Sequence, residues 1–225
     1  VWINEGTDAS GQLIFRDSGQ RLGNGSSIKV AMGDLNGDGW VDAFVANHGS
    51  GKFTDPADRA WINQGTDVNG QWLGFASSGQ EIGIGVGLEE GLELHSAAVS
   101  LGDFDGDQDL DLVTASGGNE AKQGSRLHPI LYLNHGGRFE TAANFPELET
   151  NASDIVAEDL DGDGDLDLII SSNARPQQFA RGSRQIVLFN SGSGKFDDVS
   201  ESFGADLQEI GLIDDLEVCD LNKDS

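Results

Sequence analysis

The chain has 225 residues, with 39 Asp or Glu against 13 Lys or Arg and a formal net charge of −26 at pH 7. Such a charge excludes nucleic acid and anionic membranes as partners and favours cations. The 32 glycines and 4 prolines follow no collagen-like period, and no apolar run approaches the roughly 18 residues of a membrane span. A single cysteine excludes an intrachain disulfide framework, and we interpret Cys219 as a small core residue.

The chain opens on a predicted β-hairpin. Residues 1–15 read VWINEGTDASGQLIF: a short apolar strand, an Asn/Gly turn and a second strand with an aromatic residue. Related segments return as AWINQGTDVNGQWLGF (60–75), LYLNHGGRFET (131–141) and VLFNSGSGKFDDV (187–199). The start has neither the basic nor the apolar segment of a signal peptide, so we expect a mature chain or a fragment.

A second motif alternates with these hairpins. VAMGDLNGDGWVDAFVAN (30–47), VSLGDFDGDQDLDLVTAS (99–116) and VAEDLDGDGDLDLIISSN (156–173) are near-copies, and EVCDLNKDS at the chain end begins a fourth. Their first aspartates, Asp34, Asp103, Asp159 and Asp220, recur at a period of about 60 residues. Each period therefore contains two strands around an acidic loop, followed by a hairpin.

Four short antiparallel strands in each period predict an all-β fold, a β-propeller with four-stranded blades. We expect blades at 28–77, 96–142 and 153–200, the end of another blade at 1–17 and the start of a further one at 212–225, all in one propeller segment. At about 61 residues per blade, the 225 residues give about 3.7 blades, which is too few for a closed ring of such blades. We expect part of a longer propeller; the alternative is a four-bladed ring closed by its two ends.

The loops between the first and second strands carry the acidic residues. They follow the pattern D-x-[DN]-x-D-[GQ]-x-x-D, close to the first nine positions of an EF-hand loop. A hard divalent cation takes six to eight oxygens at about 2.3–2.6 Å, and alternate residues of a coiled loop supply them. We assign as ligands the side chains at positions 1, 3, 5 and 9 and the backbone carbonyl at position 7: Asp34, Asn36, Asp38, Trp40 and Asp42; Asp103, Asp105, Asp107, Asp109 and Asp111; Asp159, Asp161, Asp163, Asp165 and Asp167.

We expect the ion to be calcium, because cages made of protein oxygens suit it better than magnesium. Positions 2 and 8 are apolar in all three loops and should anchor each loop on its blade, which a merely solvated acidic turn does not need. An EF-hand or a dockerin requires a helix after the loop, where the residues here predict strands. Gln108 stands at position 6, where glycine permits the sharp turn, so we expect the second site to be the weakest or most distorted. A fourth loop, Asp220, Asn222 and Asp224, stops before position 9.

With these loops at this period, the chain resembles the FG-GAP/VCBS repeat family, the calcium-loop propellers typified by integrin α-chain head domains. The resemblance covers essentially the whole chain. It implies a propeller, usually seven-bladed, with calcium in the loops between the first and second strands on one face. It also implies an extracellular or cell-surface location and ligands that meet the opposite face. Gln108, the incomplete fourth loop and the incomplete ring depart from the family pattern.

The opposite face is predicted to concentrate positive charge. The loops between the second and third strands, roughly 48–58, 117–128 and 173–184, together with the adjacent residue 59, hold 7 of the 13 basic residues. Arginine forks suit carboxylate and sulfate groups, which favours an acidic glycan or protein segment as ligand. The alternative is that these polar loops serve solubility alone. The candidate ligand-face residues are Lys52, Arg59, Lys122, Arg126, Arg175, Arg181 and Arg184.

We expect a calcium-binding, non-enzymatic module for extracellular recognition, adhesion or assembly. Its partners would be a protein or glycan ligand and either the rest of a longer chain or other copies that complete the ring, with no nucleic acid and no membrane insertion. The sequence contains no G-x-S-x-G and no H-E-x-x-H motif. Two alternatives stay open: a lectin-like glycan-binding propeller, and a calcium-dependent polysaccharide-degrading enzyme whose base would be an Arg or Lys of the basic loops.

Overall fold

The computed structural model describes residues 1–47, 57–83, 96–117, 128–148, 150–173, 184–203 and 213–219. These ranges contain fourteen β-strands and one short 3-10 helix, so the described part of the chain is all-β, as the sequence predicts. No helix in these ranges is long and apolar enough to cross a membrane.

The strands form a two-stranded hairpin and three four-stranded antiparallel sheets, in which each strand pairs with its neighbour in sequence. The hairpin joins β1 (Trp2–Thr7) to β2 (Leu13–Asp17). Sheet I contains β3 (Ser27–Gly33), β4 (Asp42–Asn47), β5 (Asp58–Asn63) and β6 (Phe75–Ile82). Sheet II contains β7 (Ser96–Gly102), β8 (Asp111–Ser116), β9 (Ile130–Asn134) and β10 (Phe139–Thr141). Sheet III contains β11 (Ala152–Glu158), β12 (Asp167–Ser172), β13 (Arg184–Asn190) and β14 (Phe196–Asp198), followed by the 3-10 helix η2 (Ser200–Phe203).

The strands of the three sheets lie where the repeats predict them, but the last strands of sheets I and III end at other residues than the predicted blades. β6 runs to Ile82 instead of residue 77, because its last residues pair with the start of β5. β14 ends at Asp198 instead of residue 200, because the Asp198 carboxylate accepts the backbone N–H of Ser200 (3.0 Å) and starts the turn of η2.

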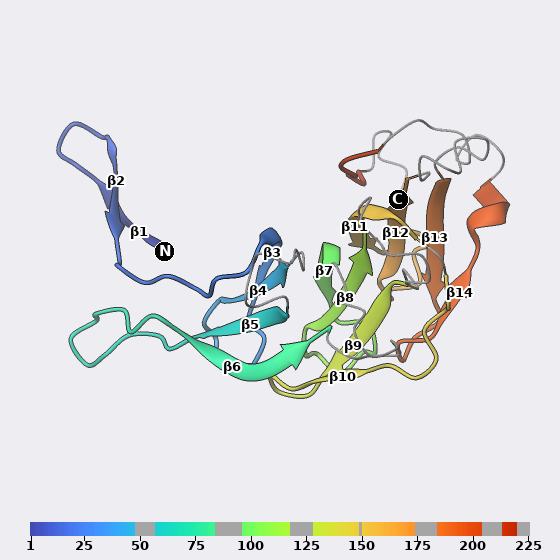
Figure 1. Ribbon diagram of the computed structural model, residues 1–225, viewed down its shortest axis with the longest axis horizontal. Helices are drawn as coiled ribbons and strands as arrows, with labels where there is room; N and C mark the ends of the chain where they lie inside the picture. The colour runs from blue at the N-terminus through green and yellow to red at the C-terminus, as the bar shows by residue number, and fades with distance from the viewer. Residues whose placement is uncertain are drawn as a thin grey trace.

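The three sheets lie side by side and meet along their first strands (Figure 1). β7 contacts β3 of sheet I on one side and β11 of sheet III on the other. Lys29 on β3 reaches β11 as well, where its Nζ lies 2.7 Å from Oδ1 of the nearly buried Asp154. The described residues therefore form a row of three sheets that contact one another in succession.

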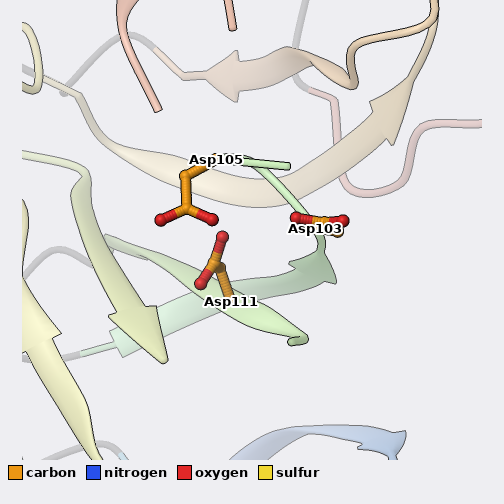
Figure 2. A group of neighbouring side chains, drawn as sticks. All are labelled: Asp103, Asp105 and Asp111. Atoms are coloured by element: carbon orange, nitrogen blue, oxygen red, sulfur yellow. The ribbon is translucent and has the colours of Figure 1, made fainter. Parts of the chain in front are cut away.

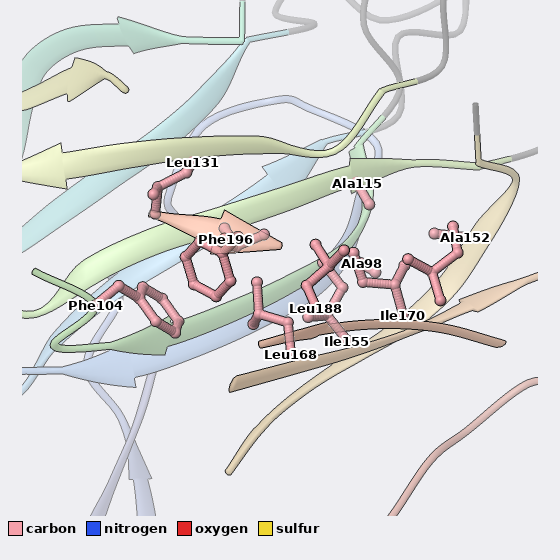
Figure 3. Packing of buried hydrophobic residues seen from close by; sticks show 12 residues of the cluster. Ala98, Phe104, Ala115, Leu131, Ala152, Ile155, Leu168, Ile170, Leu188 and Phe196 are labelled. Atoms are coloured by element: carbon pink, nitrogen blue, oxygen red, sulfur yellow. The ribbon is translucent and has the colours of Figure 1, made fainter. Parts of the chain in front are cut away.

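Two apolar cores hold the sheets together. The core between sheets I and II includes Phe44, Leu112 and Tyr132. The core between sheets II and III, drawn in Figure 3, includes Phe104 and Val113. Side chains alternate along a strand, so β8 sends Leu112 into the first core and Val113 into the second, and all six of its residues are buried. Full burial of each such Leu, Val or Phe contributes roughly 1.5–3 kcal/mol.

On the face of sheet I that points away from sheet II, strand β3 is apolar and exposed. Val30 and Met32 on β3 are 55% and 56% exposed. Val99 and Ile155 occupy the position of Val30 in the next two repeats, and they are only 9% and 5% exposed. They are buried because the preceding sheet covers them. Sheet I therefore presents to solvent the same kind of surface that sheets II and III pack against their predecessors.

The β1–β2 hairpin stands apart from the three sheets (Figure 1). Gln20, which follows the hairpin, is hydrogen-bonded to sheet I. The Gln20 amide donates to the carbonyl of Phe75 (2.6 Å) and accepts its N–H (2.9 Å). Gln80 on β6 makes the same pair of hydrogen bonds with Phe139 of sheet II. The segment that follows the hairpin is thus joined to sheet I in the way that sheet I is joined to sheet II.

Residues 213–219, expected to begin a further blade, lie against sheet III without forming a strand. Ile213 N donates to Asn173 Oδ1 (2.9 Å) and Leu216 N donates to Asp154 Oδ2 (3.0 Å). Cys219 is exposed, so its interpretation as a core residue is wrong. The side chain is not enclosed because this segment does not pair into a sheet.

Candidate metal centres

Each sheet carries one acidic loop between its first and second strands. Loop 1 (34–42), loop 2 (103–111) and loop 3 (159–167) begin directly after β3, β7 and β11, and they end on the first residue of β4, β8 and β12. Because the three sheets share one strand order, the loops occupy corresponding ends of their sheets. Positions in each loop are numbered 1 to 9.

The aspartate at position 1 organises the turn. In loop 3, Asp159 Oδ1 accepts the backbone N–H of Gly162 (2.8 Å) and Oδ2 accepts that of Gly164 (3.1 Å). Asp34 and Asp103 bind the N–H groups at positions 4 and 6 of their own loops in the same way. These local hydrogen bonds hold the backbone in a tight coil, which brings alternate side chains together.

The aspartate at position 9 is fully buried and fixes the loop on its sheet. Asp111 Oδ2 accepts the N–H of Phe104 at position 2 (2.8 Å), and Oδ1 accepts that of Asn134 at the end of β9 (2.8 Å). Asp42 and Asp167 are equally buried and make the same pair of bonds in their own sheets. Each carboxylate oxygen keeps a further lone pair with which to coordinate a cation.

Position 6 has a left-handed backbone in all three loops. The φ angle is 87° at Gly39, 75° at Gln108 and 96° at Gly164. The expectation that Gln108 occupies a conformation suited to glycine is therefore confirmed, and a residue with a Cβ is strained there. That loop 2 binds its ion more weakly stays a prediction.

The apolar positions anchor the loops in two different places. Leu35 and Phe104, at position 2, are each 1% exposed and belong to the cores between sheets. Leu110, at position 8 of loop 2, packs over Gly33 of the preceding sheet, where an added Cβ would lie 2.6 Å from Leu110 Cδ1. Val41, at position 8 of loop 1, is 50% exposed, because the described residues place no preceding sheet over it. Position 8 therefore anchors a loop on the preceding sheet and not, as expected, on its own.

Three carboxylates converge in loop 2 and again in loop 3. Asp103, Asp105 and Asp111 each offer an oxygen within 4.8 Å of the others, and Figure 2 shows these carboxylates gathered at the loop. Loop 3 forms the equivalent group: Asp159, Asp161 and Asp167. Both groups contain oxygen donors only, the type that suits Ca²⁺ and other hard divalent cations.

Loop 1 has a lower charge. Its position 3 is Asn36, whose Nδ2 donates to Asp38 Oδ2 (2.9 Å). Loop 1 therefore has three side-chain carboxylates at the predicted ligand positions, whereas loops 2 and 3 have four each. Because fewer carboxylates repel one another in loop 1, a bound cation stabilises this loop less than it stabilises loops 2 and 3.

Burial and crowding make the ionised loops costly without a cation. Burial raises the pKa of Asp111 to about 6, and the charges of Asp105 and Asp107 add to this against hydrogen bonds from Asn134 and Phe104. The position-9 aspartates of loops 1 and 3 have raised pKa values for the same reason. A bound cation reverses this effect because it stabilises the ionised form. The donor set and its electrostatics thus fit a divalent cation.

Some predicted ligands lie outside these groups. At position 5, Asp107 Oδ1 accepts the N–H of Asp109 (2.9 Å), and the Asp109 carboxylate accepts the N–H of Gly136 (2.9 Å). Coordination by the side chains at position 5 and by the carbonyls at position 7 stays a prediction. The predicted ligands of the fourth loop lie outside the described residues: Asp220, Asn222 and Asp224.

The predicted basic face is described at few of its residues. Arg59 lies at the start of β5, and its Nη2 is 3.2 Å from Glu81 Oε1. Arg184 begins β13. Five of the predicted residues lie outside the described ranges: Lys52, Lys122, Arg126, Arg175 and Arg181. The polarity of charge between the two faces stays a prediction.

An asparagine at the end of the third strand of each sheet has a role that the sequence pattern does not indicate. Asn63, Asn134 and Asn190 each donate a backbone N–H to the position-9 aspartate of their own sheet, at 2.7–2.8 Å. The signal in the sequence is the repeated W-I-N, Y-L-N and L-F-N, but this pattern by itself indicates only a turn residue. Its link to the acidic loop requires the folded sheet.

Fold and loops together define an all-β repeat protein whose unit is a four-stranded sheet with an acidic nine-residue loop. Residues 103–170 match a family model described as FG-GAP-like repeat. The matched segment begins at the first aspartate of loop 2, includes loop 3 and ends within β12. Residues 103–170 therefore carry an FG-GAP-like repeat, which confirms the resemblance for this segment. The chain matches no curated protein.

Proposed function

We propose that the chain is a calcium-binding, non-enzymatic module for recognition, adhesion or assembly outside the cell. The observation that carries the proposal is the convergence of three carboxylates in loop 2 and again in loop 3. The two loops also share the hydrogen bonds at positions 1, 2 and 9. An incidental acidic turn has no reason to reproduce this arrangement at the same place in successive sheets.

Calcium suits the loops better than magnesium. Magnesium demands near-octahedral geometry at about 2.0–2.1 Å and keeps several of its waters. Calcium accepts six to eight oxygens in an irregular shell, so it suits a loop that offers carboxylates at four positions and a carbonyl at a fifth. Affinities of about 10⁻⁴–10⁻³ M are typical of calcium modules that work outside the cell.

The role proposed for calcium is structural. Loops 1 to 3 place 3, 4 and 4 carboxylates at predicted ligand positions, and these groups repel one another when no cation is bound. Four side chains at positions 2 and 8 of these loops lie in the spaces between sheets: Leu35, Phe104, Leu110 and Leu166. An ion that orders a loop would therefore also stabilise the packing of one sheet on the next.

We further propose that the sheets are blades of a propeller, usually seven-bladed in this family, of which the chain supplies a part. The repeated packing of each sheet on its predecessor and the repeated Gln20 and Gln80 contacts support this arrangement. The exposed Val30 and Met32 would be covered by a preceding blade. The rest of a longer chain, or other copies, would supply it. A protein or acidic glycan ligand would bind the basic face opposite the calcium loops.

Titration of the calcium-depleted chain with CaCl₂ in a calorimeter tests the proposal. We expect binding that magnesium displaces poorly, and we expect Asp103→Ala combined with Asp159→Ala to remove the contributions of loops 2 and 3. Asp8→Ala is a matched control, because Asp8 also accepts backbone N–H groups in an acidic turn but belongs to no group of converging carboxylates among the described residues. Absence of calcium binding by the unaltered chain would refute the proposal.

A further inference from the structure

One buried side chain lies between two acidic loops. Asn134 is 0% exposed, and its Nδ2 donates to the carbonyl of Leu35 (2.7 Å) and to that of Leu110 (2.9 Å). Its Oδ1 accepts the N–H of Gly137 (2.8 Å), and its own N–H binds Asp111 Oδ1. Every hydrogen-bonding group of the Asn134 side chain is therefore used, and the amide orientation is fixed.

These partners belong to two different loops. Leu35 is position 2 of loop 1, between the predicted ligands Asp34 and Asn36, whereas Leu110 and Asp111 are positions 8 and 9 of loop 2. The turn that follows Asn134 also lies against loop 1, since a Cβ at Gly137 would be 3.2 Å from Asn36 Cβ. Asn134 thus joins the backbone of one candidate calcium loop to the end of the next.

The same link joins loops 2 and 3. Asn190 Nδ2 donates to the carbonyl of Phe104, position 2 of loop 2 (2.9 Å), while its backbone N–H binds Asp167 at position 9 of loop 3 (2.8 Å). Gly194 N donates to the same Phe104 carbonyl (2.8 Å), and a Cβ at Gly194 would lie 3.7 Å from Asp105 Cβ. Each link therefore holds the segment that carries positions 1 to 3 of the preceding loop.

Asn63 occupies the equivalent position in sheet I with a different set of partners. Its backbone N–H binds Asp42 Oδ1 (2.7 Å), and its Nδ2 donates to the carbonyl of Val41 (3.1 Å). Its Oδ1 accepts the N–H of Gly65 and the indole N–H of Trp72. All of these hydrogen bonds stay within sheet I. Among sheets I to III, two asparagines at this repeat position thus join neighbouring loops, and one serves a single loop.

We propose that Asn134 and Asn190 are positioning residues that couple calcium binding between neighbouring loops. An ion in loop 2 fixes Asp111, which holds the Asn134 backbone; the Asn134 amide then holds the Leu35 carbonyl between two ligands of loop 1. The coupling is reciprocal, because an ordered loop 1 presents that carbonyl to Asn134 in return. Binding of the first ion thus lowers the ordering cost for the second. This inference rests on the proposed calcium function.

Calorimetry on a chain in which Asp161→Ala disables loop 3 isolates loops 1 and 2. The affinity of loop 2 for Ca²⁺ is measured with loop 1 intact and with loop 1 disabled by Asp34→Ala. We expect loss of loop 1 to weaken loop 2 about fivefold or more, the lower range of allosteric coupling. In the Asn134→Ala background, the same Asp34→Ala change should leave the affinity of loop 2 for Ca²⁺ unchanged.

Asn63→Ala is the matched control. It removes the same side chain at the equivalent position, so the coupling between loops 1 and 2 should persist. Melting temperatures without calcium measure any loss of folding separately. If Asn134→Ala does not fold, the effect of Asp34→Ala in the otherwise unaltered background still tests the inference, because independent loops would overturn it. Independent affinities of the two loops, or coupling that survives Asn134→Ala, would overturn the inference, whereas absence of calcium binding would overturn the proposed function instead.

Discussion

Two buried aspartates, Asp58 and Asp111, have similar immediate surroundings. Asp58 is 2% exposed, and one of its oxygens accepts the N–H of Asn47 in the same sheet (2.7 Å). The other accepts the hydroxyl of Ser96, which belongs to sheet II (2.6 Å). Asp111 also accepts two hydrogen bonds and is fully buried. Burial raises the pKa of Asp58 to about 7 and that of Asp111 to about 6.

Their neighbours distinguish the two. Asp103 and Asp105 bring oxygens within 4.8 Å of Asp111, whereas Asp58 belongs to no such group among the described residues. Burial by itself makes an ionised carboxylate costly, and only convergence with other carboxylates gives a divalent cation its shell. Asp58 should therefore reduce stability at neutral pH, and Asp111 should require an ion.

Removal of the Asp111 carboxylate should have the largest effect. Asp111→Ala leaves the buried N–H groups of Phe104 and Asn134 without an acceptor, at about 1–3 kcal/mol each. We expect a loss of about 2–6 kcal/mol in the free energy of unfolding in chelator, measured by urea denaturation, and loss of calcium binding at loop 2. Asp107→Ala is the control, because this more exposed residue accepts one N–H. Equal losses for the two variants would contradict the special role of position 9.

Asp58→Asn should instead stabilise the protein, and the more so at higher pH. Between the unfolded value of 3.8 and the folded pKa of about 7, the unfolded chain loses its proton while the folded protein keeps it. The free energy of unfolding therefore falls as pH rises through this window, and the loss is complete above pH 7. An asparagine accepts from Asn47 and donates to the Ser96 hydroxyl without carrying charge. We expect a gain of about 2–4 kcal/mol at pH 8 and a smaller gain at pH 5.

Urea denaturation of both chains in chelator at the two pH values measures this difference. Because calcium is absent from both samples, the loops contribute equally to the variant and to the unaltered protein. A gain that stays constant with pH, or a loss at pH 8, would show that Asp58 is ionised in the folded protein at little cost.

The sequence predicts that carboxylates converge in the loops, but it does not predict that the buried Asp58 lowers the free energy of unfolding. Positions 1, 3 and 9 of the loops follow from a fixed spacing within nine residues, and the strands follow from a repeated pattern. The contacts between repeats do not, since the bond from Asn134 to the Leu35 carbonyl joins residues 99 positions apart. Asp58 had no counterpart in the other repeats to mark it. The exposure of Val41 likewise depends on which sheet lies next to it.

Gln108→Gly should change the stability and the calcium affinity of the protein least among these substitutions. Relief of a left-handed non-glycine residue gains about 1–2 kcal/mol, and the greater freedom of glycine in the unfolded chain offsets about 0.5–1 kcal/mol of it. We expect loop 2 to bind calcium a few-fold more tightly in calorimetry. Gly164→Ala should weaken calcium binding by loop 3. The space around an added Cβ is open there, so the substitution costs only backbone strain. Weaker calcium binding after Gln108→Gly would show that position 6 is wrongly assigned.

Thermal unfolding in calcium and in chelator tests most directly whether the converging carboxylates hold structural calcium. At 100 times its dissociation constant, calcium adds about 2.7 kcal/mol for each loop that binds it only in the folded state. A domain of this size shifts by about 2–4 °C for each kcal/mol, so three loops predict a fall of more than about 10 °C on chelation. Calcium should restore the melting temperature and magnesium should not. An unchanged melting curve in chelator would show that the carboxylates hold no structural calcium.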